Sequence, residues 1–528
     1  MKQPKRVSAT AFKLCYFLLL TPGFSNAELP AKIPEGCGTP PSNIPCYGKP
    51  PMIVPAEESY LAGPLEQRNM RIQQLSSETH SFYILPATPA TTTWGYFDSS
   101  LKPALTIKPG DTVAIETLPG GGGNVAPGIT IEALEYINAA VHGRGPHTMT
   151  GPIAVENAKP PSGTDQGDVL AIHINKIRMR SYATNNSGDF AGLFSEYGQG
   201  GPYQSPVFPH FVGHFIDSYY LDNDKLEMEF ERKPHVVIPL RPFPGVLAVA
   251  RAREDEQLAY TGNTPPDPLE KMGWCINNPP APLKGPGCNT KQPGNFGGNL
   301  DLPAMTVGST TYLPVHQKGG LIWTGDSHAA QGNGEIDLDA LETAFPELNV
   351  TINVIHRADR PEFGDQPIVE TATAWVTVGY AVSLNLALDN LKKETVRFLS
   401  AKYHLTTAEA EKRMLAVWDC PISEVVDEVL GTYCIIPKSP KITQSLDVPK
   451  HDTKTHWVSY MRDPKDLMAA MKKAAFESVR QMAREIGIPE SRAYKLATFV
   501  QDCRIERPDL REGYGVSCMV PKSILRKD

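Results

Sequence analysis

The stretch Thr324–Glu335, T-G-D-S-H-A-A-Q-G-N-G-E, combines a histidine and acidic residues with three glycines. It follows G-L-I-W (Gly320–Trp323), an apolar segment that predicts a strand entering a Gly-rich turn. The spacing of Asp326 and His328 suits two metal ligands, because alternate side chains of an extended chain lie on one face. A simpler interpretation is also open, in which Asp326 caps the turn and His328 is an ordinary half-buried residue. Other parts of the sequence are needed to choose between a metal site and a capped turn.

The length and composition of the chain favour a mainly β protein with several domains. Its 528 residues exceed what one hydrophobic core usually supports, so about two to four domains are expected. With 49 prolines and 43 glycines, the chain favours short strands and turns over long helices. The formal net charge of -7 argues against a nucleic-acid partner, which would require a basic surface.

The first 27 residues predict a cleaved secretory signal peptide. Basic residues precede the apolar core L-C-Y-F-L-L-L (Leu14–Leu20), and Ser25-Asn26-Ala27 offers small residues for cleavage after Ala27. The apolar core is too short to span a bilayer, and no later segment is long enough, so no membrane span is expected. The expected location is therefore periplasmic or secreted.

Removal of this signal peptide would leave eight cysteines, an even number that suits disulfides in an exported chain. They are Cys37, Cys46, Cys275, Cys288, Cys420, Cys434, Cys503 and Cys518. Local bridges are geometrically easy in the Pro/Gly-rich loops around 37/46 and 275/288. The sequence alone does not choose among the many pairings that eight cysteines allow.

The pattern along the chain predicts six consecutive regions. They are a signal peptide (1–27), an extended arm (28–75), a β-rich catalytic region (76–360), an α+β unit (361–440), a linker (441–456) and a duplicated α+β unit (457–528). Within the β-rich region, A-L-T-I-K-P-G-D-T-V-A-I-E (Ala104–Glu116) predicts a β-hairpin. Residues 178–235 predict an irregular, aromatic-rich loop or wall over a site.

The two C-terminal units repeat one pattern. Each begins with W-V-T or W-V-S at Trp375 or Trp457, continues through a long helix and reaches an Asp-Cys pair. The units end in T-Y-C-I-I-P-K-S (Thr432–Ser439) and V-S-C-M-V-P-K-S (Val516–Ser523). The predicted long helices are Leu384–Tyr403 and Lys465–Ile486. Because neither unit contains a clustered set of histidines and acids, we interpret the repeats as structural or oligomerising, and we expect a homo-oligomer.

Three clusters in the β-rich region offer metal ligands. They are His147, Asp301 and the group Asp326, His328 and Glu335, each in a Gly-rich turn at the end of a predicted strand. A metal that activates water needs about three or four such groups from separate loops. The sequence supplies that number, but it does not show that they meet in space.

Other chemistries have weaker support in the sequence. Ser309 and Ser327 do not lie in G-x-S-x-G, and no Ser-x-x-Lys pattern precedes a helix, so we interpret Ser309 as a turn residue. Paired cysteines in an oxidising compartment argue against a cysteine nucleophile. His210 and His214 have helical spacing but lack an acidic partner, which favours packing. No G-x-G-x-x-G or Walker motif occurs, so no nucleotide site is expected.

Five motifs resemble, in order, those of the acetamidase/formamidase family of amide hydrolases. They are T-T-W-G-Y-F-D (Thr92–Asp98), G-R-G-P-H-T-M-T-G-P-I-A-V-E-N-A (Gly143–Ala158), R-P-F-P-G-V-L-A-V-A (Arg241–Ala250), G-G-N-L-D (Gly297–Asp301) and Thr324–Glu335. The resemblance covers roughly residues 80–439. It implies a mainly β fold, with jelly-roll-like or barrel-like β domains followed by α+β units. It also implies an amidase that hydrolyses a small aliphatic amide, such as formamide or acetamide, to the carboxylate and ammonia.

The same motifs suggest a set of site residues, to which we assign roles as hypotheses. The metal ligands would be His147, Asp301, Asp326 and His328, and the catalytic residues would be Glu335 as general base and Gln331 as the group that holds the amide. The expected cofactor is a divalent metal ion, with zinc favoured and calcium as the alternative. The expected partner is a small amide.

One position departs from the family pattern. Thr93 stands where many family members carry a histidine before W-G, which removes one possible ligand. This substitution and the duplicated C-terminal unit keep a second hypothesis open. In it, the chain is a non-enzymatic envelope protein that uses the same β scaffold for ligand binding or assembly.

Overall fold

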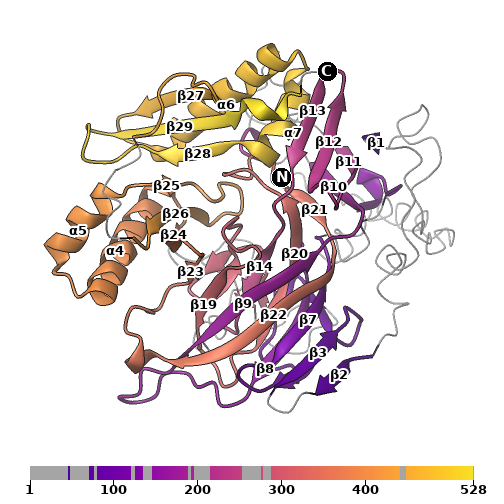
Figure 1. Ribbon diagram of the computed structural model, residues 1–528, viewed down its shortest axis with the longest axis vertical. Helices are drawn as coiled ribbons and strands as arrows, with labels where there is room; N and C mark the ends of the chain where they lie inside the picture. Colours follow the sequence, from indigo (N-terminus) through magenta and orange to yellow (C-terminus); the bar gives the residue numbers. More distant parts are fainter. Residues whose placement is uncertain are drawn as a thin grey trace, which may run out of the picture.

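The structure is a computed structural model in which strands predominate and the long helices lie in the C-terminal part of the chain (Figure 1). The described residues are 46–47, 71–76, 80–120, 125, 127–134, 145–187, 192–195, 215–252, 275–276, 287–439 and 447–526. The predicted fold class, mainly β followed by α+β units, is confirmed. The predicted signal peptide, Cys37, His210, His214 and most of the predicted arm lie outside the described residues, and the predicted domain boundaries stay predictions.

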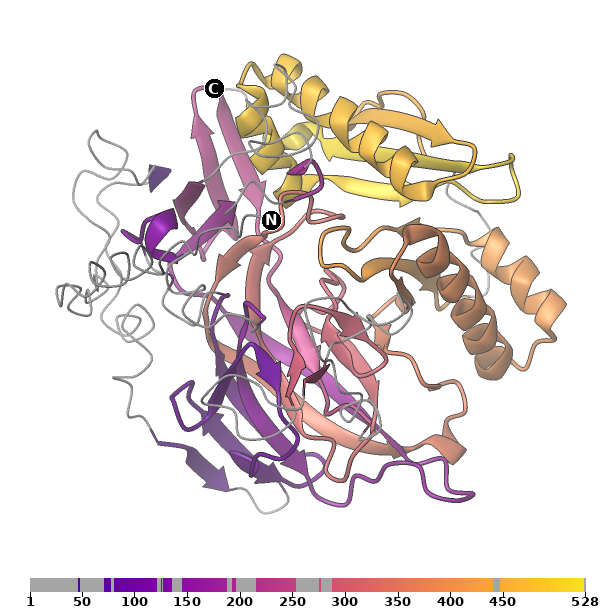
Figure 2. The same ribbon diagram turned by 180° about the vertical axis from the view of Figure 1, so that it is seen from behind.

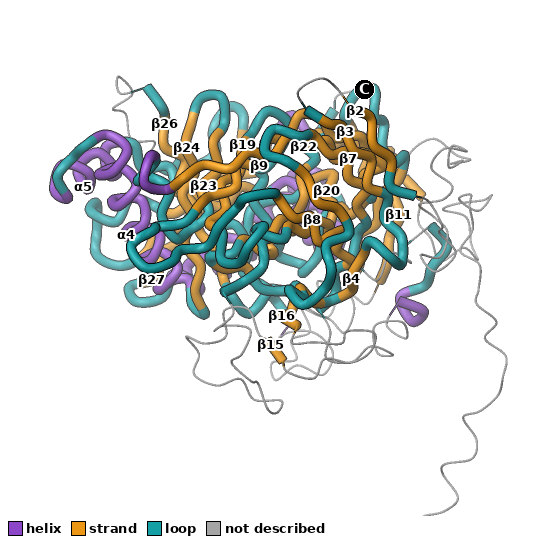
Figure 3. The backbone as a smooth tube through the Cα atoms, turned by 90° about the horizontal axis from the view of Figure 1, so that it is seen from below, coloured by secondary structure: helices purple, strands orange, loops and turns teal. Residues whose placement is uncertain are grey.

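The strands of two large sheets lie side by side (Figure 3). The sheets share one hydrophobic core, to which Trp323 of the first sheet and Ile352 of the second both belong. The eleven strands described in the first sheet are β1 (Cys46–Tyr47), β4 (Thr92–Trp94), β6 (Leu105–Ile107), β8 (Thr148–Val155), β10 (Tyr182–Ser187), β11 (Phe215–Tyr220), β14 (Phe243–Ala248), β17 (Pro293–Gly294), β18 (Gly297–Asn299), β20 (Ile322–Ala330) and β21 (Leu341–Thr343). The nine described in the second are β2 (Gln73–Ser76), β3 (Ser81–Leu85), β7 (Thr112–Thr117), β9 (Asp168–Arg178), β19 (Thr310–Pro314), β22 (Phe345–His356), β23 (Ile368–Glu370), β24 (Ala374–Ala381) and β26 (Leu430–Pro437).

Smaller elements complete the β-rich region. A two-stranded sheet contains β12 (Glu227–Arg232) and β13 (His235–Pro239), and a three-stranded sheet contains β5 (Tyr96–Phe97), β15 (Cys275–Ile276) and β16 (Gly287–Asn289). Short 3-10 helices are η5 (Arg357–Asp359) and η6 (Lys522–Ile524). None of the helices in the described part of the chain has the length and apolar character needed to span a bilayer.

Two predictions about the β-rich region were wrong. The segments of the predicted hairpin do form strands β6 and β7, but β6 pairs with β8 and β7 pairs with β3 and β22, in different sheets. Asp111 accepts a hydrogen bond from the backbone N–H of Ser81 at the start of β3, so the turn is held by the strand that pairs with β7 and not by pairing of β6 with β7. Residues 178–235 are not simply irregular, because their described part contains β10, β11 and β12.

The two C-terminal repeats have one architecture, a strand, two helices and two strands (Figure 2). The first repeat contains β24, α4 (Leu384–Tyr403), α5 (Thr407–Ala416), β25 (Cys420–Pro421) and β26. The second contains β27 (His456–Asp463), α6 (Leu467–Ile486), α7 (Glu490–Val500), β28 (Asp502–Ile505) and β29 (Tyr514–Pro521). Disulfides join Cys420 to Cys434 and Cys503 to Cys518 at equivalent positions, so the duplication seen in the sequence is also a structural one.

The repeats meet through equivalent strands. β25 pairs antiparallel with β28, and Pro421 lies opposite Arg504, each being the residue that follows the first cysteine of its repeat. An antiparallel pair of equivalent strands relates the two repeats by an approximate two-fold rotation. The four-stranded sheet β25-β28-β29-β27 therefore runs from one repeat into the other.

Candidate active site

Asp326 and His328 lie within a strand rather than on a turn after it. β20 continues from Ile322 to Ala330, so the prediction that the strand ends at Trp323 was wrong. Strands β8, β14 and β21 all pair with β20, and β14 and β21 extend the ladder past the glycine at 325. Asp326 is 2% exposed and His328 is fully buried, which excludes the simpler interpretation of a half-buried histidine beside a capped turn.

The four predicted metal ligands come together from three separate segments, because Asp326 and His328 both lie on β20. His328 Nε2 lies 3.2 Å from Asp326 Oδ2, and His147 Nε2 lies 3.7 Å from the same oxygen. His328 Nδ1 lies 3.6 Å from Asp301 Oδ1. His147 directly precedes β8, and Asp301 follows β18, so residues far apart in the sequence share one buried cluster.

The absence of a side chain at Gly245 leaves space among these groups. Gly245 lies on β14, between β20 and β18 in the sheet. A Cβ atom at this position would lie 2.4 Å from Asp326 Oδ2, 2.6 Å from His328 Cε1 and 2.9 Å from Asp301 Oδ1. Within the described residues, both carboxylate oxygens of Asp301 and Oδ1 of Asp326 are buried without a hydrogen-bond partner. Carboxylate and imidazole donors around such a space fit a divalent cation.

Backbone and side-chain carbonyl groups orient both histidines. The carbonyl oxygen of Thr290 lies 3.2 Å from His147 Nδ1, and Oε1 of Gln331 lies 2.8 Å from His328 Nδ1. Because an amide oxygen only accepts, each Nδ1 carries a proton, and the lone pair of each neutral Nε2 could therefore ligate a cation beside the carboxylate of Asp326. Gln331 Nε2 is buried without a hydrogen-bond partner in the described structure, so it can still donate.

The histidines and burial have opposite effects on the pKa of Asp326. Burial by itself would raise the pKa of Asp326, but the nearby imidazoles of His147 and His328 outweigh burial and lower that pKa to about 2. Burial would likewise lower the pKa of His328, yet Asp326 raises it overall. Asp326 is therefore a carboxylate at every working pH.

The surroundings of Asp301 and Glu335 raise the pKa of each carboxyl group, in contrast to Asp326, whose pKa is lowered. Burial raises the pKa of Asp301 well above its usual value, and the charges of Asp326 and Asp427 raise it further. Burial also raises the pKa of Glu335, with added contributions from Asp301 and Asp427. Such a concentration of buried carboxyl groups favours either a bound cation or bound protons.

The predicted site residues also share an unusual backbone conformation. Asp301, Asp326 and Glu335 have φ angles of 43°, 52° and 46°. Non-glycine residues in this left-handed region are uncommon and gather at functional sites. The ligand atoms of Asp301, His328 and Glu335 all lie within 4.8 Å of one another, so the six residues between His328 and Glu335 fold back onto the cluster.

Sequence reasoning missed three acidic residues of the site. Glu342 lies directly opposite His328 in the β20–β21 ladder, and ligand atoms of Asp326, His328 and Glu342 lie within 4.8 Å of one another. Glu424 and Asp427 reach the cluster from the loop between β25 and β26. The interpretation of the repeats as structural or oligomerising did not anticipate that acidic residues of the first repeat lie beside the candidate site. The acidic residues on both sides of two valines in S-E-V-V-D-E (Ser423–Glu428) were an available signal.

The remaining candidates have structural roles. Ser309 donates a hydrogen bond to the carbonyl of Thr306, which confirms it as a turn residue. The hydroxyl of Ser327 lies 2.5 Å from that of Thr117, so it is engaged away from His328. Thr93 is buried on β4, and its hydroxyl has no hydrogen-bond partner among the described residues.

Comparison with known proteins agrees with this geometry. The model of the Acetamidase/Formamidase family matches residues 90–383, more than half of the chain, and this range contains every predicted site residue. The chain belongs to this family. A formamidase of Methylophilus methylotrophus is 26% identical over 284 residues, which cover 50% of this chain and 66% of that protein. An acetamidase of Mycolicibacterium smegmatis is 26% identical over 300 residues, which cover 49% of this chain and 68% of the relative.

Solved structures share the fold of this family member. An acetamidase from Bacillus halodurans superposes with a TM-score of 0.51 at 23% identity, covering 67% of this chain and 97% of the other. An acetamidase from Yersinia enterocolitica gives a TM-score of 0.52 at 20% identity, covering 69% and 93%. The chain thus spans about two thirds of the curated relatives it matches and nearly all of these solved chains.

Proposed function

We propose that this protein hydrolyses a small aliphatic amide, such as formamide or acetamide, to the carboxylate and ammonia. The observation that carries the proposal is the convergence of Asp301, Asp326 and His328 on the space beside Gly245, with Glu335 next to them. Membership of the Acetamidase/Formamidase family gives the substrate class. The curated relatives are a formamidase and an acetamidase, so the acyl group is left open between these two.

The proposed cofactor is a divalent cation. His147, Asp301, Asp326 and His328 would hold it, and zinc is favoured over calcium because half of these side chains are imidazoles. When bound, such an ion supplies Lewis acidity that activates water and polarises the amide. Nε2 of each histidine is available because a carbonyl oxygen accepts from Nδ1.

The proposed roles of Glu335 and Gln331 follow from their surroundings. A Glu with a raised pKa binds a proton more readily than an ordinary carboxylate, which suits a group that accepts and then returns one. Glu335 would take a proton from the attacking water as the new C–O bond forms. It would then deliver that proton to nitrogen as the C–N bond breaks, so that ammonia leaves. Gln331 Nε2 would donate a hydrogen bond to the carbonyl oxygen of the substrate.

The location and assembly of the protein are part of the proposal. Disulfides in both repeats are compatible with an oxidising compartment, which supports export to the periplasm or the medium. A homo-oligomer stays a prediction. The alternative function, ligand binding or assembly without catalysis, rests on the duplicated C-terminal unit and on Thr93 in place of the usual histidine.

The test is ammonia release from formamide and acetamide by the full chain, before and after treatment with a chelator, and with zinc or calcium added back. We expect turnover that stops on chelation and returns with one of the two ions. A folded protein that releases no ammonia from either amide would favour the alternative. Turnover that persists after complete metal removal would instead overturn the metal chemistry alone.

A further inference from the structure

We propose that the second C-terminal repeat positions the candidate catalytic residues through the contact of its Asp502 with Asn333, and that both are positioning residues. This inference rests on the proposed function, because Gln331 and Glu335 flank the segment Gly332-Asn333-Gly334. The segment lies between the two repeats and has hydrogen bonds to both. The second repeat therefore acts on the reaction without contacting the substrate.

Main-chain hydrogen bonds hold the segment from two sides. The N–H of Gly332 donates to the carbonyl of Thr498 at 2.7 Å, and the N–H of Asn333 donates to the carbonyl of Gln501 at 2.7 Å. Both acceptors belong to the second repeat, at the end of α7. The N–H of Gly334 donates to the carbonyl of Ser423 in the first repeat at 2.9 Å. Three consecutive amides are thus fixed by the repeats rather than by neighbouring β-strands.

The contact at Gly332 leaves no space for a side chain. A Cβ atom there would lie 2.7 Å from the backbone nitrogen of Gln501, 2.8 Å from its carbonyl oxygen and 2.9 Å from the carbonyl oxygen of Ala497. These are backbone atoms, which cannot rotate away as a flexible side chain can. The second repeat therefore packs directly on the segment next to Gln331.

The side chain of Asn333 connects the two repeats. Its Oδ1 accepts a hydrogen bond of 2.9 Å from the hydroxyl of Tyr433 on β26, and its Nδ2 donates one of 2.6 Å to Asp502 on β28. Asn333 is 8% exposed, so water cannot replace either partner cheaply. An amide satisfies both neighbours, whereas a carboxylate at this position would face the carboxylate of Asp502.

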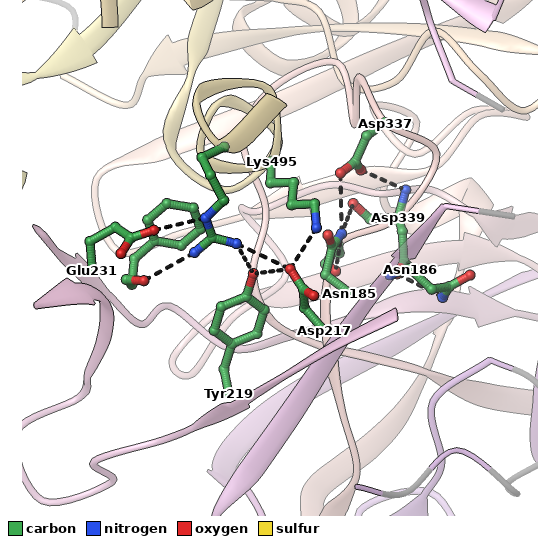
Figure 4. A network of polar contacts seen from close by, with 11 residues as sticks. Asn185, Asn186, Asp217, Tyr219, Glu231, Asp337, Asp339 and Lys495 are labelled. Atoms are coloured by element: carbon green, nitrogen blue, oxygen red, sulfur yellow. Dashed lines mark hydrogen bonds and ion pairs between the residues drawn. The ribbon is translucent and has the colours of Figure 1, made fainter. Parts of the chain in front are cut away.

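Helix α7 is itself fixed to the β-rich region by buried ion pairs (Figure 4). Arg492 lies 3.1 Å from Asp217 and 2.8 Å from Glu231, and Lys495 lies 2.6 Å from Asp217. Tyr494 also donates a hydrogen bond to the carbonyl of Ile336, which directly follows Glu335. The helix that holds the segment is therefore held in turn by the sheet on which the site is built.

The test is a reciprocal exchange of the two polar side chains. Asn333→Asp places two carboxylates in contact, and we expect kcat for formamide to fall about 100-fold with little change in KM, because Gln331 and Glu335 move. Asp502→Asn alone should have a small effect, since an amide oxygen can still accept. The double variant Asn333→Asp/Asp502→Asn should recover most of the lost kcat, because the hydrogen bond re-forms in the opposite direction.

Asp419→Asn is the matched control. Asp419 is the first-repeat counterpart of Asp502, and both pair with Arg504, but Asp419 does not contact Asn333. This control should leave kcat close to that of the wild type. If Asn333→Asp fails to fold, recovery of folding by the added Asp502→Asn gives the same answer. Asp502→Ala removes the acceptor for Asn333 together with the ion pair to Arg504, and it should still lower kcat.

Amide hydrogen exchange across 331–335 separates this inference from the proposed function. Asn333→Asp should accelerate exchange in this segment, and the double variant should restore protection, whether or not the protein is an amidase. If the wild type releases no ammonia but the variants show this exchange pattern, the proposed function is wrong and the positioning of the segment by Asn333 and Asp502 is still supported. Equal kcat and equal exchange in Asn333→Asp and wild type, or no recovery in a folded double variant, would overturn the positioning role.

Discussion

The two C-terminal repeats share their strands, helices and disulfides but contribute differently to the candidate site. The loop between the last two strands is buried in the first repeat (422–429), where Glu424 and Asp427 raise the pKa of Asp301. The equivalent loop of the second repeat (506–513) is largely exposed. The second repeat instead offers carbonyl groups and Asp502. Duplication has thus kept the framework, while one copy sets the charge of the site and the other sets its geometry.

The largest effect should come from the site that both repeats surround. Asp326→Ala removes the carboxylate that contacts His147 and His328, and we expect ammonia release to fall about 1000-fold or more together with loss of the bound divalent ion. Asp365→Asn, at an exposed ion pair with Arg357, is the control and should retain full activity. Substantial turnover by Asp326→Ala would show that this cluster is not the active site. The contacts of the two repeats with it would then have no role in catalysis.

Removing the disulfide of either repeat should have an effect of intermediate size and allows the two repeats to be compared. Replacing both cysteines of Cys420–Cys434 or of Cys503–Cys518 by alanine should lower the free energy of unfolding by about 3 kcal/mol in either repeat, because the closed loops have similar lengths. Denaturant unfolding measures this. At temperatures where both variants are folded, kcat should fall more in the first-repeat variant, since Asp427 and Tyr433 both lie in the loop that the Cys420–Cys434 disulfide closes. Equal losses of kcat would remove the proposed division of roles.

A smaller effect should distinguish the two loops by pH dependence. Asp427→Asn removes a negative charge that raises the pKa of Glu335, so that pKa should fall. If Glu335 is the base, the acidic limb of kcat/KM, where activity rises with pH, should move to lower pH, with a loss of about tenfold in kcat/KM at its optimum. Asp509→Asn in the equivalent loop of the second repeat should leave the profile unchanged. A profile that Asp427→Asn does not shift would contradict the electrostatic role of the first repeat.

The sequence predicted those parts of the site that depend on local spacing or on a family motif. Asp326 and His328 alternate along one strand, so their shared face followed from the period of two. His147, Asp301 and Glu335 were found through motifs, and the structure brings them together. The helix Leu384–Tyr403 was predicted with its observed bounds, because its apolar spacing is a local property.

What the sequence did not predict depends on register and on long-range packing. Glu342 faces His328 only because β21 pairs with β20 in one particular register, which no local pattern specifies. The turn after Ile107 has a hairpin signature, but the strands on either side pair with segments from elsewhere in the chain. Asp427 reaches the site through the docking of a whole repeat. Each of these contacts joins residues at a large sequence separation.

The rate of ammonia release from formamide by Gly245→Ala, relative to the wild type, tests the central claim most directly. The added methyl would occupy the space among Asp301, Asp326 and His328 without removing any polar group. If this space is the catalytic centre, the folded variant should lose activity by about 100-fold or more. A folded Gly245→Ala protein with the activity of the wild type would contradict the placement of the active site.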